Sequence, residues 1–399
     1  MKRCLQSVES HTTALRHVKI HTNMASSIGL KEGILVVSCL LLCCCSHRQT
    51  ERGREVPMRY AWNISIEDYG AYRLVSMANP WQPQKQLHRY VLIAREDSAR
   101  MAGRNLPEGT VIYTPLRRSV VFNTAHAQLA CWLGAAAQIR GVADLKYMNV
   151  PKMKNGVATG RVVDCGNSMA PDVEAIVQLR ADGVLLSPFE NSGGYGRLEQ
   201  IGVPIIECAE YMETSPLGRA EWMRFYGMLY GKEQEADSLF ALVESEYQKL
   251  KSRSRPLSSR PSLLTEKLTG STWYIPGGKS TVAQLIADAG ATYAWSMDEH
   301  SGSLALSFET VVSKAADADV WLFNDIGDKA TYERLASENQ GYRLFKAYKQ
   351  HRVWSVNSLK EPYFEEVSFR PDRLLRDYII MLHPGLLQGS TRYYKELKD

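Results

Sequence analysis

The residues best placed to do chemistry are two glutamates at equivalent places in a segment that occurs twice. One copy begins at Asp172 and reads Asp-Val-Glu-Ala-Ile-Val, and the other begins at Ser307 and reads Ser-Phe-Glu-Thr-Val-Val. In each copy a capping residue precedes an apolar residue and a glutamate, which is typical of the first turn of a helix. The helix dipole stabilises a carboxylate there, and arginine pairs with it bidentately. Either glutamate alone is explained as a good first-turn residue, but their equivalence predicts that Glu174 and Glu309 are matched acidic groups on two similar α/β lobes.

A second set of residues has the chemistry of a small-molecule pocket. Polar and aromatic side chains follow several predicted strands, and in parallel sheets ligands sit beyond the carboxyl ends of the strands. The candidates are His126, Asn167, Ser187, Glu190 and Tyr195 in the first half of the chain and Trp273, Tyr274, Asp325 and Arg370 in the second half. Each has a plainer interpretation: a packed or capping histidine, a core or hairpin aromatic pair, a turn tyrosine, or a solvated loop acid.

These residues are positioned by strands that alternate with helices, a pattern that predicts parallel sheets. The predicted strands are 72–76, 89–93, 120–123, 139–142, 184–187, 205–208, 263–266, 320–323 and 353–356. The predicted helices are 127–137, 173–179, 280–290, 308–316, 331–338 and 370–383. The fold class is therefore α/β, with two lobes that each have a central, mainly parallel sheet flanked by helices and a ligand cleft between them.

One long helix is expected to join the two lobes. Residues 232–252 carry apolar side chains at a 3.6-residue period. Twenty-one residues at 1.5 Å each give about 30 Å, the width of a small domain. The predicted organisation is a signal peptide at 1–45, a tether at 46–58, an N-terminal lobe at 59–230, a bridging helix at 231–255 and a C-terminal lobe at 256–399.

The N-terminal segment has the features of a secretory leader. Residues 34–45 are apolar except for Ser38, and this run is too short for a bilayer, which needs about 20 residues. It ends in Cys43-Cys44-Cys45-Ser46, which resembles a bacterial lipoprotein signal in which a cysteine is lipidated and becomes the mature N-terminus. Cys45 is the predicted lipidation site and Cys44 the alternative.

Composition narrows the function classes. A net charge of +5, dispersed along 399 residues, does not favour nucleic-acid binding. The three cysteines of the body, Cys131, Cys165 and Cys208, are an odd and widely spaced set. That spacing fits neither a disulfide framework nor a zinc cluster, so they are predicted to be small buried residues.

Several stretches in this order resemble one protein family, the substrate-binding proteins of ABC importers that have a rigid helical link and serve cobalamin, ferric siderophores and haem. The matching stretches are Leu133–Ala135 with Ile139–Val142, Asp172–Leu179 with Ala181–Val184, Leu198–Ile206, and Ile275–Gly278 with Ala289–Ala291. The resemblance covers about residues 115–385. It departs from the family pattern at Ala181, where proline is usual, and in the long segment 59–115.

The resemblance implies a monomeric, lipid-anchored protein of the bacterial cell envelope that faces the periplasm. It implies a chelate ligand, with cobalamin and ferric siderophores ahead of haem, held between the lobes, where Trp and Tyr faces suit a flat ligand and Arg370 suits an acidic group. It also implies that Glu174 and Glu309 meet arginines of the permease. No resident cofactor or metal is expected.

Other classes of protein are weighed on their own residues. Gly277-Gly278-Lys279-Ser280 lacks the earlier glycine of a phosphate-binding loop, because Trp273 stands there, and no hydrolase motif is present. The chain is therefore not expected to be an enzyme. A bare zinc or manganese ion would need converging His and carboxylate side chains, and only His126 follows a predicted strand. A non-transport surface lipoprotein is the remaining alternative.

Overall fold

The computed structural model describes residues 53–82, 84–190, 194–327 and 329–399. The predicted signal peptide and Cys45 lie outside these residues. The predicted tether is partly described, and there it is wrong: β1 (Arg54–Val56) pairs antiparallel with β2 (Ile64–Asp68). Within the described ranges, no helix is both long and apolar enough to cross a membrane.

The first lobe is built on a parallel sheet with the strand order β12-β11-β6-β7-β8. Its strands are β6 (Ser119–Val121), β7 (Ile139–Val142), β8 (Val163–Asp164), β11 (Gly183–Leu186) and β12 (Ile205–Glu207). The lobe also contains α2 (Thr124–Trp132), α3 (Pro151–Ala158), α4 (Val173–Gln178), α5 (Arg197–Gln200) and the short hairpin β9 (Gly166–Asn167) and β10 (Ala170–Pro171). Every residue of β11 is buried, as expected for a parallel strand covered on both faces.

The second lobe repeats this plan with the strand order β16-β13-β18-β19-β20, in which only β20 is antiparallel. Its strands are β13 (Ser262–Thr265), β16 (Thr292–Tyr293), β18 (Val320–Asn324), β19 (Val353–Val356) and β20 (Lys395–Glu396). A small antiparallel sheet is formed by β14 (Leu268–Thr269), β15 (Thr272–Pro276) and β17 (Ser303–Leu306). The helices are α9 (Thr281–Asp288), α10 (Phe308–Ala315), α11 (Tyr332–Glu338), α12 (Lys346–Lys349), α13 (Tyr363–Glu366) and α14 (Pro371–Leu382). The predicted fold class is confirmed.

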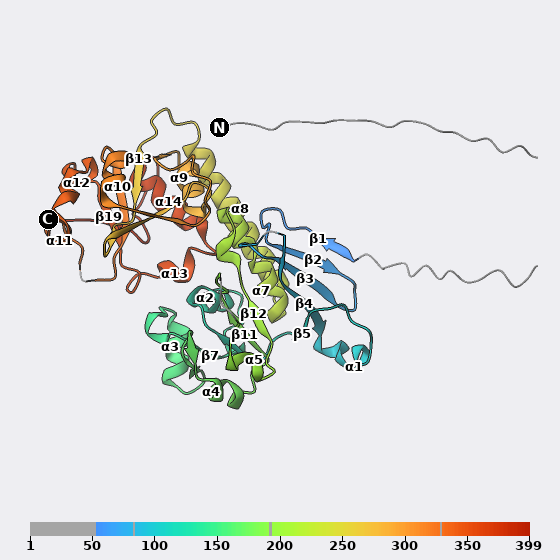
Figure 1. Cartoon of the computed structure of the whole chain (residues 1–399). Helices are drawn as coiled ribbons and strands as arrows, with labels where there is room; N and C mark the ends of the chain where they lie inside the picture. Colours follow the sequence, from blue (N-terminus) through green and yellow to red (C-terminus); the bar gives the residue numbers. More distant parts are fainter. Residues whose placement is uncertain (1–52, 83, 191–193, 328) are drawn as a thin grey trace, which may run out of the picture. The chain divides into compact units, whose positions relative to one another are not determined.

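The lobes are joined by α6 (Pro216–Glu221), α7 (Met223–Tyr230) and the long helix α8 (Glu233–Ser254). Gly231 separates α7 from α8 with a φ of 64°, a left-handed conformation that glycine adopts without steric cost. The 22 residues of α8 span about 33 Å. Its buried side chains Phe240, Val243 and Tyr247 follow the helical period, and Figure 1 shows α8 running from the second lobe past α7.

The chain before the first lobe forms a sheet of its own, ordered β1 to β5, with β3 (Arg73–Ala78), β4 (Gln86–Ala94) and β5 (Thr110–Thr114) and the short helix α1 (Ser98–Met101). Two buried carboxylates of the linking region fix its start. Glu221 accepts the backbone N–H groups of Arg59, Tyr60 and Ala61 at 2.7–2.9 Å. Glu213 accepts those of the next two residues and the indole N–H of Trp222. Only two of these five strands were predicted from the sequence.

The cysteines of the body behave as predicted. Cys131, Cys165 and Cys208 are buried and form no disulfide. Burial raises the pKa of the Cys165 thiol to about 12, so this group stays a neutral thiol at physiological pH.

Candidate functional site

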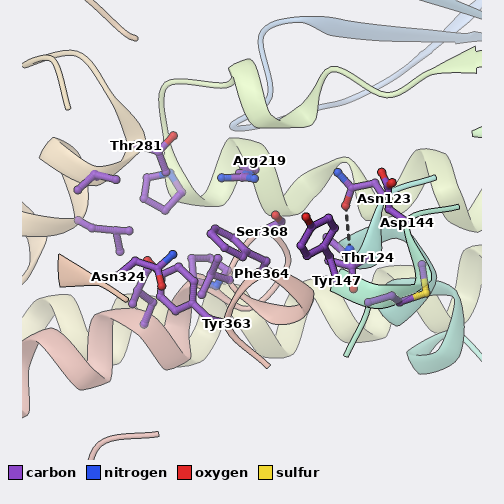
Figure 2. A pocket seen from close by; sticks show the side chains of 18 of the residues that line it. Asn123, Thr124, Asp144, Tyr147, Arg219, Thr281, Asn324, Tyr363, Phe364 and Ser368 are labelled. Carbon is purple, nitrogen blue, oxygen red and sulfur yellow. Dashed lines mark hydrogen bonds between the residues drawn. The ribbon is translucent and has the colours of Figure 1, made fainter. Parts of the chain in front are cut away.

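Residues of both lobes line a cavity of about 610 Å³. This volume falls within the range of about 300–1,000 Å³ typical of small-molecule sites. First-lobe residues on its wall include Asn123, Thr124, Asp144 and Tyr147, and second-lobe residues include Glu266, Asn324, Tyr363 and Phe364. Figure 2 shows most of these side chains arranged around the cavity, with Arg219 reaching it from α6.

The topology explains why these residues meet. Asn123 follows β6, Asp144 follows β7, Glu266 follows β13 and Asn324 ends β18. All four lie at the carboxyl ends of parallel strands, where α/β sheets bind ligands. Asn123 also caps α2, because its side-chain oxygen accepts the Ala125 N–H at 2.8 Å.

A second cavity of about 700 Å³ adjoins the first, since Asn123 and Asp144 line both. Its walls come from the first lobe: the β9–β10 hairpin, the end of β11 with Ser187, and the loop that carries Tyr195. Exposed Met169 and Phe189 give this wall apolar surface. The two cavities together form one cleft, with one arm in the first lobe and one arm between the lobes.

Arg219 is the most unusual group in the cleft. Among the described residues, none forms a hydrogen bond or an ion pair with its guanidinium, and its Nε is buried without a partner. Burial lowers the pKa of Arg219, and the field of Glu210 partly offsets this. Glu210 is already bonded to His126 Nε2 at 2.8 Å. Arginine nevertheless stays protonated, so the cleft contains a half-buried cation with no ion-pair partner among the described residues.

A chain of hydrogen bonds connects the cleft to the N-terminal sheet. The Tyr195 hydroxyl donates to Glu207 Oε1 at 2.7 Å, and Glu207 Oε2 lies 2.9 Å from His88 Nδ1. His88 Nε2 in turn lies 2.8 Å from the hydroxyl of Thr110 on β5. The N-terminal sheet therefore holds one wall of the cleft in place.

The two lobes also touch directly beside the cavity. Glu365 of α13 is 1% exposed, and its Oε1 accepts the Thr124 hydroxyl at 2.8 Å and the Asn149 backbone N–H at 2.7 Å. The Asn149 side chain donates to the Lys360 carbonyl at 3.2 Å. These bonds tie the mouth of the first lobe to the second lobe.

A comparison with known proteins identifies this architecture. The profile of the periplasmic binding protein family matches residues 120–358, more than half of the chain. The chain belongs to the periplasmic binding protein family. A similar curated sequence, an uncharacterized lipoprotein of Methanocaldococcus jannaschii, is 25% identical over 359 residues, which are 84% of each chain.

Solved structures of substrate-binding proteins share the fold of this periplasmic binding protein. A periplasmic haem-binding protein of Pseudomonas aeruginosa superposes with a TM-score of 0.56 at 15% identity, covering 71% of this chain and 98% of that one. A possible iron-binding (periplasmic solute-binding) protein of Staphylococcus epidermidis gives a TM-score of 0.54 at 17% identity, covering 68% and 100%. At these identities the likeness concerns the fold.

Two ligand candidates of this periplasmic binding protein are buried in the core, and the prediction for them is corrected. His126 is fully buried in α2, where its Nε2 meets Glu210 and its ring packs against Tyr226 at 5.2 Å. Trp273 is fully buried on β15, and its indole N–H donates to the Thr265 carbonyl at 3.0 Å. Neither side chain can touch a solute in the cleft.

Two charged candidates are neutralised by protein partners and line neither cavity. Arg370 makes a bidentate pair with Asp372 at 2.6 and 2.9 Å. Asp325 pairs with Arg334 and lies 3.8 Å from Lys267 Nζ. Each charge is compensated within the second lobe, so the predicted ligand role is corrected for both.

Of the five other candidates, two line the cleft and three do not. Ser187 and Tyr195 line the second cavity, and Ser187 Oγ accepts a hydrogen bond from the Asn123 side chain at 3.1 Å. Asn167 lies on the exposed hairpin beside that cavity, and Glu190 is exposed in the loop after β11. Tyr274 is 49% exposed on β15 and lies on the wall of neither cavity.

The matched glutamates sit at equivalent helix starts. The Asp172 side chain accepts the Ala175 N–H at 2.9 Å, and the Ser307 hydroxyl accepts the Thr310 N–H at 3.3 Å. Glu174 is exposed in the first turn of α4 and pairs with exposed Arg197 at 2.5 Å, which lowers the pKa of its carboxyl. Hydrogen bonds from its own backbone and from Ser307 lower the pKa of Glu309 in α10. Both are therefore ionised surface acids, and α4 and α10 lie in different lobes (Figure 1).

Sequence reasoning missed Arg219 and Glu266 as site residues. The sequence does signal the helix that carries Arg219, since Ser215-Pro216 marks a helix start. Arg219 stands among small and apolar residues in Pro-Leu-Gly-Arg-Ala, and this setting could have indicated that its side chain does not simply face solvent. Glu266 stood at the end of a predicted strand, where the same rule that selected the other candidates applies.

Proposed function

We propose that this periplasmic binding protein is a solute-binding lipoprotein of the cell envelope, anchored through Cys45, that captures a metal chelate and delivers it to an ABC permease. The chelate carries at least one acidic group. Cobalamin with its phosphate, ferric siderophores with acidic arms, and haem with its propionates are the candidate ligands.

The observation that carries this proposal is Arg219 in the cavity between the lobes. The half-buried Arg219 guanidinium has a buried Nε without a partner, and a carboxylate or phosphate of the ligand would supply the missing hydrogen bond and a counter-charge. Hydrogen bonds to charged groups contribute about 1.5–3 kcal/mol each, so one such contact corresponds to roughly 10- to 100-fold in affinity.

The size of the cleft and the comparisons support a chelate over a smaller solute. The two adjoining cavities offer room for a ligand larger than an amino acid or a simple sugar. The neighbouring structures described as haem-binding and iron-binding proteins use the same fold. No observation favours the bare-ion alternative: in the part of the chain that the structure describes, no group of three or more His, Cys, Asp or Glu is placed to hold a metal ion.

The direct test is a fluorescence titration of the purified protein against cobalamin, haem, and a panel of neutral and acidic ferric siderophores. At least one chelate is expected to bind saturably and without chemical turnover. Arg219→Gln should weaken that binding 10- to 100-fold, because it removes the cation but keeps a hydrogen-bonding side chain. Arg161→Gln is the matched control, since Arg161 is exposed outside both cavities.

The result that would overturn the proposal is equally clear. If no chelate in the panel saturates the protein, it is not a chelate carrier. If a chelate binds but Arg219→Gln and Arg161→Gln behave alike, Arg219 does not contact the ligand and the acidic-ligand assignment is wrong.

A further inference from the structure

Glu266 occupies an unusual backbone position at the edge of the cavity between the lobes. It follows β13 and has a φ of 64°, a left-handed conformation that costs a non-glycine residue about 1–2 kcal/mol. Two hydrogen bonds from β18 hold it there: its N–H donates to the Leu322 carbonyl at 2.7 Å, and its carbonyl accepts the Trp321 indole N–H at 2.6 Å. These bonds fix Glu266 at the end of β13, where its side chain lines the cavity.

The surroundings of Glu266 supply few hydrogen-bond donors. Among the described residues, no lysine, arginine or histidine forms an ion pair with its carboxyl. Burial raises the pKa of Glu266 to about 7, and a hydrogen bond from the Asn324 backbone only partly offsets this. The Asn324 side-chain oxygen, which borders the same cavity, is itself buried without a partner. This wall of the cavity therefore presents a carboxylate with a single backbone donor and no basic partner, and a side-chain oxygen with no donor.

The cavity has hydrogen-bond acceptors on one side and the cationic donor Arg219 on another. Arg219 lines the cavity from α6 with nitrogen donors, whereas Glu266 and Asn324 line it from the strand ends of the second lobe with oxygen acceptors. A ligand with an acidic group alone would leave the acceptor wall unsatisfied, which costs about 1–3 kcal/mol per buried group.

We propose that Glu266 and Asn324 form a second subsite of the cleft, which binds a protonated amino group of the ligand. The preferred solute then carries an acidic group for Arg219 and a protonated amine for Glu266, so that the two groups of one chelate meet opposite charges. This inference rests on the proposed chelate-binding function and specifies the kind of chelate.

The test uses three forms of one ferric trihydroxamate chelate, ferrioxamine B: its free amine, its N-acetyl derivative and its N-succinyl derivative. The three differ only in the terminal group, which is cationic, neutral or anionic. If haem is the chelate that binds in the titration, the same comparison uses two haem monoamides. The amide with ethylenediamine ends in a cationic amine, and the amide with ethylamine ends in a neutral ethyl group. Affinities are measured by titration at pH 8, where Glu266 is mostly ionised.

The wild-type protein is expected to bind the amine form about 10-fold or more tightly than the neutral form. Glu266→Gln should remove that preference while leaving the affinity for the neutral form within about twofold, and Glu266→Asn, which tolerates a positive φ, should do the same. Glu333→Gln is the matched control, because Glu333 is an exposed acid of the same lobe. Arg219→Gln should instead remove the preference for the succinyl form over the acetyl form.

Two outcomes separate this inference from the proposed function. If the chelates bind but the amine and neutral forms bind the wild type equally, or Glu266→Gln leaves the preference intact, the second subsite is refuted and the carrier function stands. If no chelate of these series or of the wider panel with cobalamin, haem and ferric siderophores binds, the carrier function is refuted and the subsite with it.

Discussion

Replacing Glu221 by alanine should detach the start of the N-terminal sheet from the linking helices. Glu221 is fully buried, and its two oxygens accept three consecutive backbone N–H groups at 2.7–2.9 Å. Each hydrogen bond to a charged group contributes about 1.5–3 kcal/mol, and three together set an upper bound of about 9 kcal/mol. Some of the freed N–H groups become hydrated because Arg59 and Tyr60 are only partly buried. We therefore expect Glu221→Ala to lower the free energy of unfolding by about 3–5 kcal/mol, a large share of the 5–15 kcal/mol typical of a domain.

Urea denaturation followed by circular dichroism measures this loss, and limited trypsin digestion at Arg59 locates it. Glu221→Gln keeps one oxygen acceptor and should lose about half as much. Glu246→Ala is the control, since Glu246 pairs with Lys249 on the exposed face of α8 at 2.7 Å, and such surface pairs contribute about 0–1 kcal/mol. A Glu221→Ala protein as stable and as protease-resistant as the control would refute the reasoning.

Three further predictions follow from groups already described. Glu365→Ala should accelerate hydrogen exchange of the Asn149 amide by roughly 10- to 100-fold, because the bond that this N–H loses contributes about 1.5–3 kcal/mol; unchanged exchange would contradict the inter-lobe tie. Glu266, with its pKa raised to about 7, holds its proton longer in the folded than in the unfolded protein. The protonated Glu266 therefore contributes to the free energy of unfolding below about pH 4.5, and this contribution, about 3 kcal/mol in total, is lost by about pH 8. The urea midpoint should consequently depend less on pH in Glu266→Gln than in the wild type, and parallel pH profiles of the two proteins would contradict this. Reversing the charge of Glu174 or Glu309 should abolish uptake into cells without changing chelate affinity in solution, and normal uptake in the double reversal would remove the docking role.

The secondary structure of the two lobes could be predicted from the sequence because its signals are local. The alternation of apolar runs and capped helices located β7 and β19 to the residue, and α8 to within two residues, since each depends on neighbours a few positions away. The N-terminal sheet was harder, because its order and its attachment depend on carboxylates such as Glu221, about 160 residues further along the chain.

The candidate site was predicted less well because the direction in which a side chain points and the partner that it contacts depend on the tertiary structure. His126 was selected for its place after a strand, but its partner Glu210 lies 84 residues away and takes it into the core. The alternation within β15 buries Trp273 and exposes Tyr274, and the sequence does not show which face of a hairpin meets the core. Arg219 was overlooked because its lack of a counterion is visible only when both lobes are in place.

The hydrogen bonds of Glu365 hold the two lobes together on one side of the cleft in the protein without ligand. Lobes held in this way populate few widely open conformations. A solute that binds from the other side of the cleft therefore costs the protein little conformational entropy. Separation of the lobes on this side requires that Thr124 and Asn149 both lose their hydrogen bonds to Glu365.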